Sequence, residues 1–191
     1  MAILKFRVYW EEDEGVYRDI LIKHKQNFQD LHMAILKGYS FDSKFAATFF
    51  KSNDQWQEGR EITLEQYDKA YKVDPLMMAD TVLGTQIMDP NQKFIYLYDF
   101  DKQWRFLVEL IQIDKEESDV YEYPHILRSE GLGPIQYNTK ATIDARLTEM
   151  EEKFNFDADA LLEGFSEEGE EGSEQENDSE ESETSSEDDS I

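Results

Sequence analysis

Hydrophobic and polar residues alternate in two pairs of segments along the chain. One pair is residues 2–10 and 16–23, and the other is residues 93–100 and 103–113. A period of two is typical of a strand that buries one face, and a short polar connection between two such strands indicates a β-hairpin. The sequence therefore predicts two hairpins, with a further strand over residues 44–50 between them.

Other segments follow the spacing of a helix. Asn27 has the side chain of an N-cap, and apolar residues recur at helical spacing from there to Gly38, a natural stop. Residues 143–154 carry an apolar stripe at positions i, i+4, i+7 and i+11, which indicates an amphipathic helix. Thr63, followed three residues later by Gln66, matches a capping box and predicts a short helix.

The remaining segments are less regular. Residues 74–91 are ambiguous, and residues 121–137, which contain two prolines and two glycines, are expected to be irregular. The predicted fold class is α+β: an antiparallel or mixed sheet built from hairpins and packed against two or three helices. Such a sheet has one face in solvent.

Composition divides the chain into a body and a tail. Residues 163–191 hold 14 acidic residues and no lysine or arginine, whereas residues 1–162 hold 30 acidic and 19 basic residues, a charge of −11. A segment this charged buries too little apolar surface to offset the entropy of ordering it. We therefore predict one α+β domain over residues 1–165 and a disordered, acidic, Ser/Glu-rich tail over residues 166–191. We favour a solubilising role for the tail over mimicry of nucleic acid toward a basic protein.

Composition also narrows the functional classes. The absence of cysteine excludes a thiol nucleophile, a zinc–thiolate site, an iron–sulfur cluster and disulfides. No apolar run approaches the roughly 20 residues of a transmembrane helix, and the N-terminal residues lack the features of a signal peptide. We expect a cytoplasmic protein without membrane contact. The formal net charge of −25, with only scattered arginines, disfavours nucleic acid as a partner.

The histidines suggest no metal centre. His24, His32 and His125 lack neighbouring ligands at the spacing that a metal site needs. The chain also lacks a phosphate-binding glycine loop and a nucleophile elbow. We therefore expect no cofactor and no bound metal.

A weak catalytic candidate stands at the end of the strand over residues 93–100. Asp99 and Asp101 lie two residues apart on one face, with Glu109 and His125 as conceivable neighbours. Paired carboxylates bind Mg²⁺ or perform acid–base chemistry, but carboxylates at strand ends also accept hydrogen bonds from turns. Convergence with His125 in a cleft would favour an enzyme, and turn hydrogen bonds would favour a binding protein.

Trp56 is the candidate for an interaction residue. It lies in a polar turn between Gln55 and Gln57, where an apolar ring is unexpected. An exposed tryptophan can anchor a partner protein.

The chain resembles a known family over most of residues 1–162. The segment from Tyr98 to Phe100, followed by Trp104, is similar to the Tyr-Asp-Phe-Gly-Asp-x-Trp-x-His segment of the Ri-plasmid open-reading-frame-three-like family. Here Asp101, Lys102 and Phe106 stand where that segment has Gly, Asp and His.

Further matches to the family lie downstream. They are Tyr123-Pro124, Gly131-Leu132-Gly133 and the segment from Phe156 to Leu162, although the family's Cys and Glu-Asp pair are absent. The resemblance supports the fold. Because some family members are described as resolvase-like passengers of transposable elements, it also implies an alternative function.

The sequence favours a non-enzymatic protein-interaction or accessory module. Its partner would be an unidentified protein, and a basic one would match the acidic chain. The alternative is a mobile-element passenger protein with a cryptic metal-dependent hydrolytic or DNA-related activity, for which Asp99, Asp101 and His125 are the weak candidates.

Overall fold

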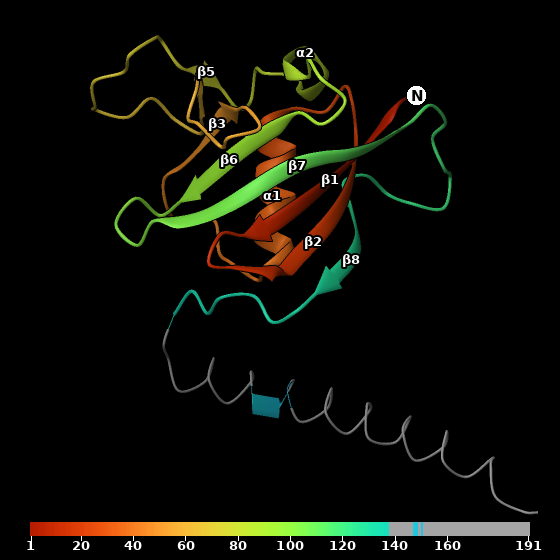
Figure 1. Ribbon diagram of the computed structural model, residues 1–191. Coiled ribbons are helices and arrows are strands. Elements are labelled where there is room, and N and C mark those ends of the chain that lie inside the picture. Colours follow the sequence, from red (N-terminus) through yellow and green to blue (C-terminus); the bar gives the residue numbers. More distant parts are fainter. Residues whose placement is uncertain (138–146, 149, 151–191) are drawn as a thin grey trace, which may run out of the picture. The chain divides into compact units, whose positions relative to one another are not determined.

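A single mixed sheet dominates the computed structural model, which describes residues 1–137, 147–148 and 150 (Figure 1). The helices of residues 1–137 are α1 (Phe28–Gly38) and the single-turn α2 (Leu83–Gln86). The strands are β1 (Ile3–Trp10), β2 (Asp13–Lys23), β3 (Ala47–Ser52), β4 (Glu61–Thr63), β5 (Leu76–Met77), β6 (Lys93–Tyr98), β7 (Trp104–Asp114) and β8 (His125–Glu130).

The eight strands of this region form one sheet in the order β5-β4-β3-β6-β7-β1-β2-β8. Every neighbouring pair is antiparallel except β4 and β5, which are parallel. Both predicted hairpins are confirmed: β1 pairs with β2, and β6 pairs with β7. The third predicted strand is also present, although it begins at Ala47.

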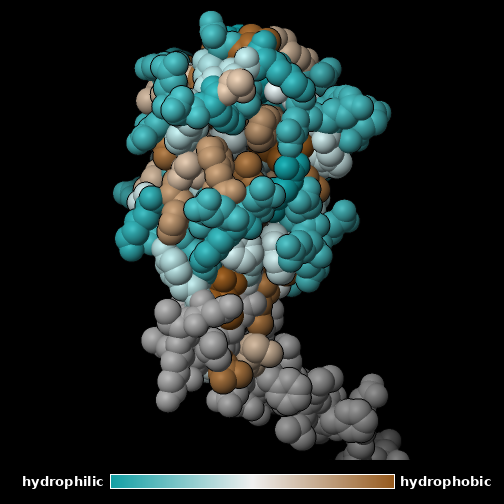
Figure 2. All heavy atoms as spheres, turned by 90° about the vertical axis from the view of Figure 1, so that its left-hand side faces the viewer, coloured by the Kyte–Doolittle hydropathy of each residue, from teal (hydrophilic) through white to brown (hydrophobic). Residues whose placement is uncertain are grey.

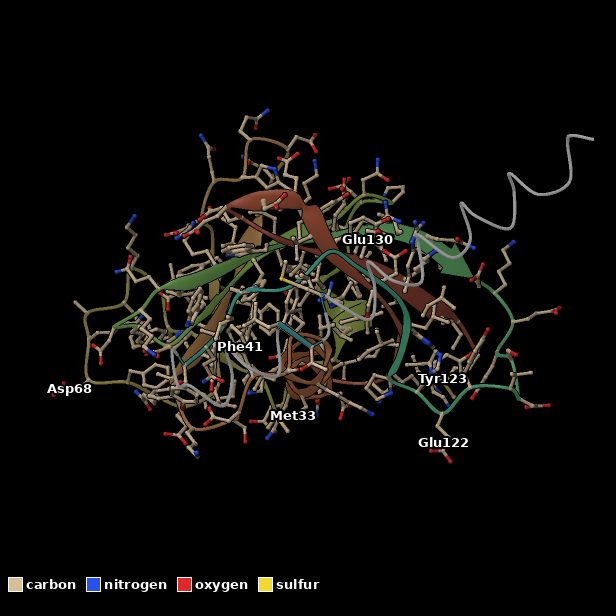
Figure 3. All side chains as sticks on the ribbon, turned by 90° about the horizontal axis from the view of Figure 1, so that it is seen from below. Met33, Phe41, Asp68, Glu122, Tyr123 and Glu130 are labelled. Carbon is tan, nitrogen blue, oxygen red and sulfur yellow. The ribbon has the colours of Figure 1, made fainter. Side chains whose placement is uncertain are left out.

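The core lies between α1 and one face of the sheet, which we call the inner face. Phe28, Leu31 and Ile35 of α1 are fully buried among large side chains from alternating strand positions, such as Phe49 and Tyr96. Figure 3, which looks along the helix, shows α1 on one side of the sheet. This arrangement follows from the two periods of the sequence, because each places its apolar residues on one face.

The predicted N-cap Asn27 holds the start of α1, and Arg18 holds its end. The Asn27 side chain accepts the backbone N–H of Asp30 at 2.9 Å, and the Asp30 carboxylate accepts the N–H of Asn27 at 3.2 Å, which completes a capping box. At the other end, the buried guanidinium of Arg18 donates to the carbonyls of Gly38 and Glu130. A carbonyl left without a partner at a helix end is thereby satisfied.

One predicted helix is wrong. Thr63 does not cap a helix but ends β4, where it pairs with Thr48 and is fully buried. Its hydroxyl donates to the carbonyl of Leu76 at 3.4 Å. The capping-box pattern is local, and pairing with β3 and β5 overrides it.

Two irregular regions contain elements that the pattern missed. Residues 74–91 contain β5 and α2, and residues 121–137 contain β8. Pro124 directly precedes β8, a position that proline tolerates because it needs no ladder hydrogen bond at an edge strand. Of the predicted helix at residues 143–154, Leu147, Thr148 and Met150 are helical.

Other predictions lie outside the described residues. These are the rest of that helix, the domain boundary at residue 165 and the disorder of residues 166–191. Residues Met1–Gln136 form one compact unit, and residues Tyr137–Ile191 are grouped as a second. Within the described part of the chain, no helix has the length and apolar character needed to cross a membrane.

A buried histidine lies in the interface between α1 and the sheet. His32 is 2% exposed, and its Nδ1 lies 2.7 Å from the hydroxyl of Tyr96 on β6. Burial lowers the pKa of His32 to about 4. The neutral imidazole is therefore part of the folded state at neutral pH.

We expect this histidine to make the stability of the fold depend on pH. In the unfolded chain His32 binds a proton below about pH 6.5, whereas in the folded chain it does so only below about pH 4. The contribution of neutral His32 to the free energy of unfolding is therefore present above pH 6.5 and is lost as the pH falls to 4. At 1.36 kcal/mol per pKa unit, the loss is roughly 3 kcal/mol. Urea unfolding between pH 4 and 7.5 measures this loss.

The matched control is His32→Asn, which cannot titrate in this range. Its free energy of unfolding should fall less than that of the original chain between pH 6.5 and 4. Parallel pH profiles for the two chains would contradict the assignment.

Candidate functional site

The face of the sheet opposite α1 is the candidate site, and we call it the outer face. Within residues 1–137 neither helix covers it, and in Figure 1 its strands lie in front of α1. A second, smaller apolar cluster lies there, formed by the buried side chains of Phe50, Ile95 and Leu107. Partly buried Tyr9, Trp56 and Leu97 pack against it.

Trp56 reaches this face from the connection between β3 and β4, residues 53–60, which we call the Trp56 loop. The backbone of Trp56 itself is left-handed, with φ of 54°. This conformation costs a non-glycine residue roughly 1–2 kcal/mol. Asn53 holds the loop: its carbonyl accepts the N–H of Trp56 at 3.0 Å, and its side-chain oxygen accepts those of Gln55 and Gln57.

A lysine lies against the indole ring. The ammonium of Lys93, at the start of β6, is 5.1 Å from the centre of the Trp56 ring. The same ammonium is 3.3 Å from the carboxylate of Asp54 and 3.6 Å from that of Glu109. The ring, the cation and two carboxylates thus form one connected cluster.

Three hollows adjoin the Trp56 loop. The smallest, of about 200 Å³, is lined by Tyr9, Glu14, Trp56, Lys93, Leu107 and Glu109. Two others, each of about 340 Å³, lie where the loop meets residues 88–93 and residues 70–73. Figure 2, which faces the left-hand side of Figure 1, shows hydrophobic side chains reaching the surface between hydrophilic ones on that side of the molecule.

The cations of the outer face are paired with carboxylates. The buried carboxylate of Asp19 accepts hydrogen bonds of 2.6 and 2.9 Å from Arg7 and lies 3.7 Å from the ammonium of Lys5. Hydrogen bonding to Asp19 raises the pKa of Arg7. Arg105 pairs with Glu11 and Glu58 at 3.1 and 2.9 Å. These positive charges are already balanced within the protein.

The candidate carboxylates at the end of β6 are not brought together with His125. Asp99 is buried with φ of 57°, and its Oδ1 accepts the N–H groups of Asp101 and Lys102 at 3.2 and 3.3 Å. Asp101 is exposed. His125 begins β8, which three strands separate from β6, and its ring lies against Tyr121. Among the described residues, no group of three or more His, Asp or Glu side chains could hold a metal ion.

A polar network adjoins the turn after β6. The Tyr98 hydroxyl donates to the carbonyl of Asp42, whose carboxylate accepts the side-chain amide of Gln136 at 2.8 Å. The ammonium of Lys102 donates to the carbonyl of Gln136 at 2.9 Å. These contacts fasten Gln136 to the end of the sheet.

Sequence reasoning singled out Trp56 but missed the residues around it. Tyr9, Glu14, Lys93 and Glu109 come from four different strands, and only the sheet order places them beside the tryptophan. Asn53 carried a detectable signal, because asparagine commonly fixes turns through its side chain.

Comparison with known proteins shows the family of residues 3–137. The family model for plasmid pRiA4b ORF-3-like protein matches residues 3–137. The crystal structure of a protein of unknown function from Methanosarcina mazei Go1 is similar, with a TM-score of 0.59, 20% sequence identity, and coverage of 78% of this chain and 82% of that one. No curated protein matches the sequence.

We expect the Asp99 carboxylate to act in the turn through its acceptor atoms. Asp99→Ala removes an acceptor from two N–H groups and leaves a left-handed alanine, so the free energy of unfolding should fall by about 2–3 kcal/mol. Asp99→Asn keeps an acceptor and tolerates that backbone, so it should lose about 1 kcal/mol or less. Denaturant unfolding measures both, and equal losses would contradict the role of the acceptor.

We expect Asn53 to position Trp56. Asn53→Ala removes the acceptor for two loop N–H groups, so stability should fall by about 1 kcal/mol and the indole should become more accessible. Acrylamide quenching of tryptophan fluorescence measures this access. The part of the emission that belongs to Trp56 is identified as the part that is lost in Trp56→Phe. Asn91→Ala, at another exposed asparagine, should change neither quantity, and identical behaviour of the two alanine variants would refute the positioning role.

Proposed function

Since the chain belongs to the plasmid pRiA4b ORF-3-like protein family, a family of unknown function, we propose its function from the surface that its own fold presents. The chain is a protein-interaction module, and the Trp56 loop on the outer face is its contact surface. The observation that carries the proposal is the partly exposed indole, held in a left-handed backbone above the apolar cluster.

The composition of this surface supports the proposal. Tryptophan, tyrosine and arginine carry most of the binding energy in protein interfaces, and Trp56, Tyr9, Tyr17 and Arg105 lie on or beside the outer face. Tryptophan and tyrosine present apolar area with a polar tip, which suits a surface that is wet when free and buried when bound. The paired charges around them form a polar rim.

A basic partner protein fits the charge of the chain. The formal net charge is −25, and opposite charge on a partner speeds encounter and excludes like-charged competitors. A nucleic acid fits less well. Phosphates are bound by lysines and arginines that displace counterions from the nucleic acid. On the outer face Arg7, Lys93 and Arg105 already pair with carboxylates.

The alternative, a mobile-element passenger with hydrolytic or DNA-related activity, has less support. Its candidate carboxylate at Asp99 accepts two turn hydrogen bonds, and His125 lies on a strand distant from β6 in the sheet. The cytoplasmic location and the solubilising role of the tail stay predictions of the sequence.

Replacing Trp56 should abolish partner capture. With the full chain as bait in extract of the native host, Trp56→Ala should reduce recovery of specific partners at least about tenfold, since truncating an anchor residue costs about 2 kcal/mol or more and 1.4 kcal/mol is tenfold. Quantitative mass spectrometry of the captured proteins measures this.

Two further variants make the result specific. Val120→Ala truncates an apolar side chain that is 82% exposed in another loop, and it should retain the partners. Trp56→Leu keeps an apolar cover over Phe50 and Ile95 but lacks the indole, and it should lose them. If all three variants recover the same proteins in the same amounts, the Trp56 loop is not the contact surface.

A further inference from the structure

The hollow of about 200 Å³ beside Trp56 has the size of a site for one side chain. It is smaller than the roughly 300–1,000 Å³ typical of pockets for drug-sized ligands. Two aromatic side chains, Tyr9 and Trp56, and the apolar Leu107 line it. Two carboxylates, those of Glu14 and Glu109, complete the lining together with Lys93.

This lining matches the chemistry that holds a cation. The face of a tryptophan ring attracts an ammonium or a guanidinium, most strongly where water is excluded, and carboxylates add charge-assisted hydrogen bonds. Glu14 makes no ion pair within the described part of the chain. It is exposed and lines the hollow, where it is available to an incoming positive charge.

The protein's own Lys93 already demonstrates this recognition. Its side chain is only 16% exposed, and its ammonium lies over the Trp56 ring between Asp54 and Glu109. The Asp54 side chain, by contrast, is 80% exposed. Because the Lys93 ammonium occupies the place over the ring, an incoming cation takes that place only by displacing it.

Charge decides what occupies the hollow. A second copy of this chain would bring another formal charge of −25 to the contact. Like charges opposed across an interface cost several kcal/mol. A basic segment of another protein has the complementary sign.

We infer that the hollow bounded by Tyr9, Trp56, Leu107, Glu14 and Glu109 binds an arginine or lysine side chain from a basic segment of the partner protein, in place of the Lys93 ammonium. The inference rests on the proposed function and names the chemistry that the contact surface recognises. Because the hollow takes one side chain, neighbouring residues of the segment lie over the apolar cluster and the Trp56 loop.

A titration of the full chain with single amino-acid probes tests this chemistry without a known partner. N-acetyl-arginine amide should shift the indole N–H resonance of Trp56 saturably, and N-acetyl-lysine amide should do the same. N-acetyl-citrulline amide has nearly the same shape without the charge, and it should bind about fivefold or more weakly. Higher ionic strength should weaken the charged probes because salt screens exposed charges.

Three protein variants locate the site. Glu14→Gln should weaken the arginine probe about threefold or more, whereas Glu12→Gln, at an exposed turn residue outside the lining, should leave the affinity unchanged. Lys93→Met removes the resident ammonium and should tighten binding about threefold or more, because the probe no longer displaces a cation. Equal affinity for arginine and citrulline probes, or equal effects of Glu14→Gln and Glu12→Gln, overturns the inference.

The outcomes also separate this inference from the proposed function. If Trp56→Ala loses host partners but the arginine probe does not bind, the contact surface stands and its basic specificity is refuted. If the probe binds but Trp56→Ala keeps every partner, the hollow binds cations and the proposed function fails. A concentration-dependent dimer that Trp56→Ala dissolves would overturn the inference in favour of a second copy.

Discussion

The packing of α1 against the inner face of the sheet is the contact on which the rest of the structure depends. The ring of Phe28 on α1 lies 5.2 Å, centroid to centroid, from the ring of Phe49 and equally far from that of Phe94. Burial of each such ring contributes about 1.5–3 kcal/mol. Because α1 packs on the inner face, the outer face, within residues 1–137, is covered by its own side chains and by the Trp56 loop. The smaller apolar cluster, the aromatic side chains of Tyr9 and Trp56 beside it, and the ion pairs around it all lie on the face that α1 does not cover.

The outer face solves a second problem, that of keeping an uncovered sheet from associating at random. Its charges alternate with its apolar positions, and the Arg7–Asp19 pair lies directly across β1 and β2. Such pairs interrupt the apolar surface of the outer face. The smaller apolar cluster lies beside the Trp56 loop, where the ion pairs of Lys93 and Arg105 border it.

The sequence predicts the parts of this structure that local rules decide. The two hairpins and the capped α1 are recognisable because their periods and caps lie within a few residues. The failures at Thr63 and β8 share a cause, since both segments take their form from pairing with another strand, β3 and β2 respectively, rather than from their own local pattern. The same limit applies to the candidate site: Trp56 is conspicuous among polar neighbours, whereas its contact with Lys93 and Glu109 depends on the register of β6 and β7, which no local pattern contains.

The indole ring at Trp56, rather than its left-handed backbone, separates a covering role from a binding role. Asp99 and Gln103 are also left-handed, and their turn is accounted for internally by the Gln103 N–H donating to the carbonyl of Asp99 at 2.6 Å. At Trp56 a glycine would close the loop without the strain of roughly 1–2 kcal/mol. Covering Phe50 and Ile95 explains an apolar side chain there, but leucine would supply that cover with no indole. The ring over Lys93 is the part that covering leaves unexplained, and it is the part on which the proposed cation recognition rests.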